Sequence, residues 1–254
     1  MRRMFFLLIV FILFLQSCSI IKKSDKHVKS FSYKLSNDIT ITHTGIVNLF
    51  SLEFIPFSFR IDYKDKIIYV DPFLVSDIKP ADYILITHSH ADHFSPSDIK
   101  KLIKKDTKII CPKTVQKNIL EESILVKPDD ILEFDNIKIE AIQSYNTKKG
   151  FLGLIAHPKS DLNTGFVIDL DGIRLYYTGD TDFIPEMKNL KNITLALVPL
   201  GGDNLTMNYK DGALAINTIK PLIVIPIHYE IGKNIAKNFS NLVDKDIKVE
   251  IIEE

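Results

Sequence analysis

The sequence has little cysteine and no excess of either charge, and each of these absences excludes a class of protein. Two cysteines among 254 residues cannot build a disulfide framework. The 32 lysines and arginines balance the 32 aspartates and glutamates, so the formal net charge is zero. This balance excludes a protein that coats nucleic acid and a chain with a strongly acidic tail. No short-period repeat, low-complexity linker or break in composition marks a second domain.

The residues that are present suit a folded globular protein. Apolar residues make up 46% of the chain, which is enough for a core of normal size. Charged residues make up 25% and aromatic residues 10%, and this composition excludes a largely disordered chain. The length fits one large domain or two small ones.

The first residues have the pattern of a targeting segment. Arg2 and Arg3 form a short basic start, and residues 4–15 are an uninterrupted apolar run. A run of this length rises only about 18 Å as a helix, which is too short for a bilayer core of roughly 30 Å. A basic start followed by a short apolar run is typical of a signal peptide.

The segment LQSC at residues 15–18 resembles a bacterial lipobox. This resemblance implies cleavage before Cys18 and attachment of a lipid to its sulfur. We therefore predict a signal peptide over residues 1–17, a flexible tether over 18–36 and a folded domain over 37–254. The predicted location is the cell envelope, outside the cytoplasm, with the membrane as a partner through the lipid. An ordinary secretory signal and an uncleaved anchor with an incidental cysteine stay open as alternatives.

From about Asn37 onward, short runs rich in Val, Ile, Tyr and Phe alternate with Gly, Pro, Asp and Asn, as in strands separated by turns. The pair Asp171-Gly172 predicts a hairpin turn, and residues 64–65 predict another. Strands followed by helices in two roughly matching halves predict an α/β fold with two packed sheets and helices outside. The expected strands are 39–44, 58–62, 66–70, 83–87, 108–111, 137–142, 164–170, 173–178, 194–199 and 222–227; the expected helices are one that begins after Ser95, and 114–121, 211–219 and 231–243.

One segment carries a dense group of polar side chains directly after an apolar strand. Residues 83–93 read YILITHSHADH, so three histidines and one aspartate fall within six residues. Imidazole and carboxylate are ligands that suit zinc. The alternating His88 and His90 can share one face of an extended turn, which leaves Asp92 and His93 to face a second ion. Buried imidazoles without partners are costly, and this disfavours a purely structural role.

The pattern His-x-His-x-Asp-His after a strand resembles the signature of the metallo-β-lactamase-fold superfamily. Further motifs resemble that family in the same order along residues 37–250. They are Asp71-Pro72 after a strand, His157-Pro158 in a loop, Gly179-Asp180-Thr181 after a strand and His228 after the last apolar strand. The resemblance implies a four-layer αββα sandwich and a metal-dependent hydrolase.

The same resemblance implies roles for individual residues. One zinc ion is expected at His88, His90 and His157, and a second at Asp92, His93 and His228, with Asp180 bridging the pair. Iron and manganese are the alternative metals, because occupancy also depends on availability. A hydroxide held by two such ions attacks an electrophilic carbonyl or phosphorus. Asp92 is expected to orient this nucleophile or to pass its proton to the leaving group.

Asp71 is expected to accept a hydrogen bond from a ligand imidazole and so to fix its tautomer. A simple turn-forming role for the Asp-Pro pair is an equal alternative.

Within the superfamily, the chain is most similar to the compact branch related to ascorbate-6-phosphate lactonases and N-acyl-phosphatidylethanolamine phospholipases. The similarity rests on QSYN at 143–146, HPK at 157–159 and LGGD at 200–203. It implies that Tyr145, Asn146 and Asn204 line the substrate mouth. The expected substrate is a small molecule or a lipid with an ester, lactone or phosphodiester bond, and no nucleic acid partner is expected.

Two other functions stay open at this point. A mononuclear iron persulfide dioxygenase uses a similar set of ligands, and iron with oxygen consumption would indicate it. A metal-stabilised binding lipoprotein would hold its full complement of metal and show no turnover.

Overall fold

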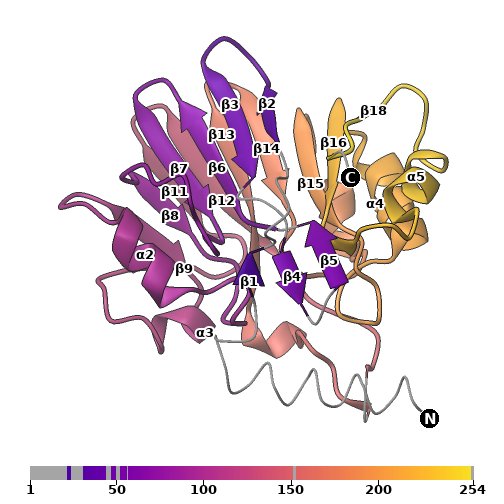
Figure 1. Cartoon of the computed structure of the whole chain (residues 1–254), viewed down its shortest axis with the longest axis horizontal. Coiled ribbons are helices and arrows are strands. Elements are labelled where there is room, and N and C mark those ends of the chain that lie inside the picture. The colour runs from indigo at the N-terminus through magenta and orange to yellow at the C-terminus, as the bar shows by residue number, and fades with distance from the viewer. Residues whose placement is uncertain are drawn as a thin grey trace.

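The computed structural model describes residues 22–23, 31–43, 47–49, 52–55, 57–150 and 153–252. The predicted signal segment and Cys18 lie outside the described residues. Among the described helices, none is both long enough and apolar enough to span a bilayer. Two seven-stranded sheets pack face to face, and helices cover their outer faces (Figure 1). This arrangement confirms the predicted four-layer αββα sandwich.

The first large sheet has the strand order β10-β9-β8-β7-β6-β3-β2. Its strands β7 to β10 are parallel to one another, and the remaining pairs are antiparallel. The strands are β2 (Ser32–Lys34), β3 (Ile39–His43), β6 (Phe59–Tyr63), β7 (Lys66–Val70), β8 (Tyr83–Leu85), β9 (Lys108–Cys111) and β10 (Ile124–Leu125).

The second large sheet has the order β11-β12-β13-β14-β15-β16-β18. Here β14, β15, β16 and β18 are parallel. The strands are β11 (Ile131–Phe134), β12 (Ile137–Gln143), β13 (Thr164–Leu170), β14 (Ile173–Tyr177), β15 (Leu195–Pro199), β16 (Ile223–Ile227) and β18 (Lys248–Val249).

A small antiparallel sheet with the order β1-β4-β5-β17 lies at one end of the sandwich (Figure 1). Its strands are β1 (Lys22–Lys23), β4 (Val47–Leu49), β5 (Leu52–Ile55) and β17 (Tyr229–Glu230). It joins the start of the described chain to a segment near the C-terminus.

The helices lie on the outer faces of the two sheets. Ile99 and Leu102 pack with Tyr69 and Ile84 on the outside of the first sheet. The helix that carries Ile216 covers the second sheet, and the Ile216 side chain is buried in the main hydrophobic cluster. Ser95 caps the first of these helices, because its Oγ accepts a hydrogen bond from the Asp98 amide at 3.3 Å. The helices are α2 (Pro96–Leu102), α3 (Lys113–Gln116), α4 (Tyr209–Ile219) and α5 (Ile235–Ser240), with 3-10 turns at Lys159–Asp161 and Pro185–Asn189.

All ten expected strands are present, with ends that differ from the predicted ones by at most two residues. The described residues also contain eight strands of two to four residues that the sequence did not predict. Strands this short do not show a hydrophobic period of their own. Both predicted hairpin turns form, with Lys64 at φ 50° and Asp171 at φ 52°.

Two predicted helices were too long. The helix expected over 114–121 is α3, which ends at Gln116. Just beyond this end, the side-chain amide of Asn118 donates back to the Thr114 carbonyl. The helix expected over 231–243 is α5, which begins only at Ile235. Asn234 has a left-handed conformation at φ 55°, so the helix cannot start before it.

The predicted boundary between tether and domain at residue 37 was also wrong. The strand β2 pairs with β3 and covers an edge of the first sheet whose backbone groups would otherwise be open. The strand β1 pairs with β4. The folded part of the chain therefore includes segments that we assigned to the tether.

The two large sheets are also connected at the end that carries the hairpin turns. The Tyr63 hydroxyl donates to Asp171 at 2.7 Å, and the Lys64 ammonium lies 2.5 Å from the same carboxylate. This contact joins the β6–β7 turn to the β13–β14 turn. The opposite end of the sandwich is left for the loops that follow the parallel strands.

Candidate metal centre

Parallel strands bring the expected metal donors to one end of the sandwich. The strand β8 precedes the His88 segment, β14 precedes Asp180 and β16 precedes His228. Because parallel strands share a direction, their carboxyl ends meet at the same edge of each sheet. The two edges face each other across the core, so donors from both sheets converge.

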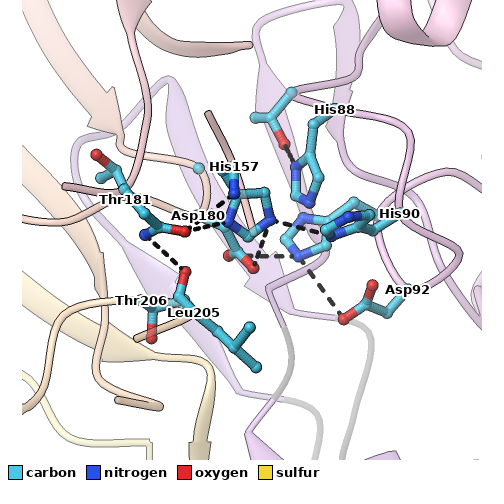
Figure 2. Close-up of polar contacts among 12 residues, drawn as sticks. His88, His90, Asp92, His157, Asp180, Thr181, Leu205 and Thr206 are labelled. Atoms are coloured by element: carbon cyan, nitrogen blue, oxygen red, sulfur yellow. Dashed lines mark hydrogen bonds and ion pairs between the residues drawn. The ribbon is translucent and has the colours of Figure 1, made fainter. Parts of the chain in front are cut away.

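The first group of donors consists of His88, His90 and His157, whose ligand atoms lie within 4.8 Å of one another. The His157 Nε2 atom is 3.0 Å from the His90 Nδ1 atom. Figure 2 shows these imidazoles turned toward a common point. The structure therefore brings together the three histidines assigned to the first ion.

The second group consists of Asp92, His93 and His228, within the same limit of 4.8 Å. Asp92 Oδ2 is 3.9 Å from His93 Nε2 and 3.8 Å from His228 Nε2. These are the three residues assigned to the second ion.

Asp180 lies between the two groups. Its Oδ1 atom is 3.4 Å from His93 Nε2, and its Oδ2 atom is 3.5 Å from His228 Nε2 and 3.9 Å from His157 Nε2. His88, His93 and Asp180 form a third group of donors within 4.8 Å. Asp180 thus has the position that a ligand shared by two ions requires.

The donor atoms fit a metal because several of them have no other partner. The Nε2 atoms of His88, His93 and His228 are buried, and none of them makes a hydrogen bond to a described residue. A buried polar atom without a partner is costly, and a metal ion is a natural partner for an imidazole lone pair. Five imidazoles converging with two carboxylates at such distances also match the donor chemistry of zinc, iron or manganese sites.

Neighbouring side chains fix the tautomers of the buried histidines. Asp71 Oδ2 is 2.7 Å from His93 Nδ1 and also accepts from the Thr87 hydroxyl at 2.7 Å. Because the Thr87 hydroxyl donates to Asp71, it is left as an acceptor for His88 Nδ1 at 2.9 Å. In both histidines Nδ1 carries the proton, so the Nε2 lone pair points to the centre. Asp71 therefore occupies the position expected of it.

Asn146 has a different place from the one we predicted. It is buried, its Oδ1 atom accepts from His157 Nδ1 at 2.7 Å, and its Nδ2 atom donates to the Leu205 carbonyl at 3.0 Å. Since Oδ1 only accepts, His157 also presents its Nε2 lone pair to the centre. Asn146 orients a ligand and does not line the substrate mouth.

The other two predicted substrate residues also have local partners. Tyr145 is buried, and its hydroxyl lies 3.2 Å from Glu186, with Lys159 over its ring. Asn204 donates to the Lys149 carbonyl at 3.2 Å and so joins two surface loops. Of these two, Asn204 alone retains partial exposure beside the site.

The electrostatics of the centre favour a bound cation. Burial, followed by the charges of nearby imidazoles, lowers the pKa of His88 well below its ordinary value, and burial lowers the pKa of His157 to about 4. Burial works against the charged form of Asp180, but neighbouring imidazoles hold its pKa well below the usual range. Burial also works against protonated His93, but Asp180 and Asp92 raise its pKa well above the ordinary value. A metal ion would replace the protons that these carboxylates attract.

The backbone is unusual at two of these positions. Asp71 has φ 45° and His228 has φ 52°, a region that non-glycine residues rarely adopt. Strain of this kind persists where the surrounding contacts impose it, and it is common at functional sites. At His228 the fit is close, because a Cβ atom on Gly201 would lie 2.9 Å from the His228 carbonyl oxygen and 3.2 Å from its Nδ1 atom.

The centre is open on one side. His90 is exposed, and Asp92 and His228 are partly exposed, whereas His88 and His93 are buried. Phe57 stacks on the His93 ring with centroids 3.9 Å apart and closes the buried side. The accessible side of the centre is therefore the one that carries His90, Asp92 and His228.

Sequence reasoning missed Thr87, Phe57 and Tyr177 as supporting residues. The Tyr177 hydroxyl lies 3.2 Å from Asp71 Oδ2 and 2.5 Å from the Phe57 carbonyl oxygen. Thr87 directly precedes the histidine pattern, and Tyr177 comes three residues before Asp180. Their positions next to motifs were the available signal.

Comparison with known proteins agrees with this geometry. Residues 56–228 match the family model described as Beta-lactamase superfamily domain. The chain belongs to this superfamily. The match includes every one of the seven donors and confirms the resemblance inferred from the sequence.

Relatives place this superfamily member among metal-dependent hydrolases. It is 31% identical over 207 residues to a UPF0173 metal-dependent hydrolase of Thermococcus onnurineus, covering 74% of this chain and 89% of that protein. It is also 31% identical over 184 residues to one from Lysinibacillus sphaericus, covering 67% and 80%. A crystal structure of a candidate metal-dependent hydrolase from Parabacteroides distasonis superposes with a TM-score of 0.74 at 33% identity, covering 89% and 98%. The protein is a metal-dependent hydrolase of the β-lactamase superfamily.

Asn146→Leu is expected to weaken metal binding about 10- to 100-fold, because it removes the acceptor that fixes the His157 tautomer. Titration with zinc against a competing chelator measures this change. Asn217→Leu is the matched control. Asn217 also donates to one carbonyl, that of Leu242, and accepts from one amide, that of Asp244, and neither of these two hydrogen bonds involves a histidine. Equal loss of metal affinity in both variants would contradict the role of Asn146.

Proposed function

We propose that the protein is a dinuclear zinc hydrolase that acts on an ester, lactone or phosphodiester and is held at a bacterial membrane by a lipid on Cys18. The observation that carries the proposal is the pair of donor triads on either side of Asp180, with orphaned imidazole nitrogens in both. A site with two triads and one shared carboxylate suits two ions better than one.

The residues of the first triad and those of the second would each hold one ion, and Asp180 would contact both. When bound, the metal ions polarise the substrate and lower the pKa of water to near neutral, which supplies a nucleophile. Asp92 is the partly exposed carboxylate at the open side, so its Oδ2 atom can accept a proton and later donate it to the leaving group. His90 and His228 border the same opening and orient the substrate against the centre.

The location of Asp92 is compatible with this role in proton transfer. Burial alone raises the pKa of a carboxyl group, but the charges of His93 and His228 hold the pKa of Asp92 below its ordinary value. It is therefore ionised at neutral pH and is ready to accept a proton from an attacking water.

Metal analysis tests the dinuclear site. We expect about two zinc ions per chain in the purified protein, because each donor triad would hold one ion. The zinc content should fall clearly in the double variant Asp180→Ala His228→Ala. Activity should then be found within a panel of esters, lactones and phosphodiesters. One iron per chain together with oxygen consumption would contradict the proposal and indicate an oxygenase. Full metal occupancy with no turnover on the panel would indicate a binding protein.

The lipid anchor has a separate test. Growth with labelled palmitate should label the processed protein that begins at Cys18, and Cys18→Ala should abolish the label. Cys111→Ala is the control, because Cys111 is the other cysteine of the sequence and is buried in the core. Label that persists in Cys18→Ala would contradict lipid attachment at this residue.

A further inference from the structure

The chain between the predicted lipid site and the folded domain is short. Lys22 and Lys23 form β1, which pairs with Asn48 and Val47 of β4. Residues 19–21 alone separate Cys18 from this strand, so the connection spans at most about 14 Å. A tether that continued to residue 36 would span up to about 65 Å. Because β1 is paired, the folded domain can lie much closer to the lipid site than a tether over residues 18–36 would hold it.

The small sheet that contains β1 also contains a strand next to the metal centre. Its order is β1-β4-β5-β17, and β17 begins at Tyr229, directly after His228. Neighbouring strands lie about 4.8 Å apart, so β1 is about 14 Å from β17 across the sheet. Together with the short connection, a lipid on Cys18 would lie within about 28 Å of His228. Figure 1 shows β1, β4 and β5 at one end of the sandwich.

One exposed leucine borders the site, and a second lies on a neighbouring loop. Leu205 is 41% exposed, and its carbonyl accepts the hydrogen bond from Asn146, the residue that orients His157. Figure 2 shows Leu205 beside the histidine cluster. Leu154 is 60% exposed, and its carbonyl accepts from the Gly150 amide at 2.7 Å.

These two leucines lie on loops that touch. The Asn204 amide donates to the Lys149 carbonyl, so the loop of Leu205 contacts the loop of Leu154. Lys149 itself is exposed. Apolar side chains beside a lysine suit a surface with acyl chains below and anionic headgroups above.

We propose that the short connection at β1 and the Leu154–Leu205 rim hold the mouth of the metal centre against a phospholipid bilayer. The inference rests on the proposed lipid attachment at Cys18, and it adds an orientation that lipid attachment alone does not impose. It also specifies the substrate class as molecules that reside in or at the bilayer. A long tether would leave the domain free to rotate, whereas this arrangement turns the face with the metal centre toward the bilayer.

The sequence contains no tryptophan, so a single introduced tryptophan reports its own surroundings. Leu205→Trp places the probe on the rim. Leu222→Trp is the matched control, because Leu222 is 65% exposed and directly precedes β16, about 20 Å from His228 along the strand. The full lipidated chain is reconstituted in vesicles of phosphatidylcholine and phosphatidylglycerol, with and without brominated acyl chains.

We expect brominated lipid to reduce the emission of Leu205→Trp at least about twofold and to leave Leu222→Trp nearly unchanged, because only the rim enters the interface. A flexible Gly-Ser linker of about 20 residues inserted between residues 21 and 22 adds roughly 25 Å of reach. It should abolish the difference between the two probes and leave hydrolysis of a water-soluble ester unchanged.

Equal quenching of both probes in the lipidated chain would overturn the orientation while leaving the proposed hydrolase intact. Absence of lipid on Cys18 would overturn the anchor and the orientation together. Absence of any hydrolysis, with quenching confined to Leu205→Trp, would overturn the proposed function and leave the orientation standing.

Discussion

Asp180→Asn is expected to lower kcat/KM for the hydrolysed substrate about a thousandfold, or roughly 4 kcal/mol of transition-state stabilisation. Asp180 is the carboxylate that lies within 4 Å of His157 from the first donor triad and of His93 and His228 from the second. An amide keeps the shape of the side chain but removes the charge that two cations would share in the proposed dinuclear site. Metal content should fall with activity, and metal analysis beside steady-state kinetics measures both.

Asp171→Asn is the matched control for this prediction. It removes the same charge from the other end of the same strand, β14, where Asp171 pairs with Lys64 at the hairpin turn. Asparagine tolerates the positive φ of this position, so the turn is retained. We expect activity and metal content close to those of the unchanged protein. Full metal content and activity in Asp180→Asn would contradict the assignment of Asp180 as the shared ligand.

Gly165→Ala is expected to destabilise the domain by about 3 kcal/mol and to lower the temperature of unfolding by roughly 6–12 °C. A Cβ atom at this position in β13 would lie 2.6 Å from the Thr178 carbonyl oxygen and 2.7 Å from that of Tyr177. Both are backbone atoms, so relief requires the end of β14 to move. Asp180 follows two residues later, and metal binding should weaken as well. Thermal unfolding followed by circular dichroism measures the first effect.

Gly150→Ala provides the comparison. Among the described residues, a Cβ atom there meets only the Leu154 carbonyl oxygen at 3.6 Å and the Asn204 Cβ at 4.0 Å, which are ordinary contacts. The change in stability should stay within about 0.5 kcal/mol, as for most surface substitutions. If the two glycine variants unfolded at the same temperature, the close approach of β13 to β14 would not be the reason for a glycine at 165.

The metal donors could be predicted from the sequence because each follows an apolar strand that is recognisable by itself. His88, Asp180 and His228 all come within three residues of the end of a predicted strand, and parallel pairing then brings those ends together. The assignment of each donor to one of two ions came from the family resemblance. The strand pattern predicted that the donors meet at one end of the sheets, and the order of the motifs predicted which donors share an ion.

The supporting residues could not be predicted in the same way. Asn146 follows a strand and was taken for a substrate contact, yet its amide faces His157, which is eleven residues further along the chain. That contact depends on the path of the intervening loop, which no local periodicity encodes. The small sheet escaped notice for a related reason, because β1 and β17 have two residues each and their partners are distant in sequence.

The wide spread of the donors along the chain has a consequence for how the protein matures. The residues of each triad extend over at least seventy positions, from His88 to His157 and from Asp92 to His228, so neither triad exists until both sheets have docked. Contacts between such distant segments form late in folding. A metal ion would therefore bind a nearly finished protein, and by mass action it would raise the free energy of unfolding by about 4 kcal/mol when free metal exceeds Kd a thousandfold. Metal supply would govern the lifetime of the folded chain as well as its turnover.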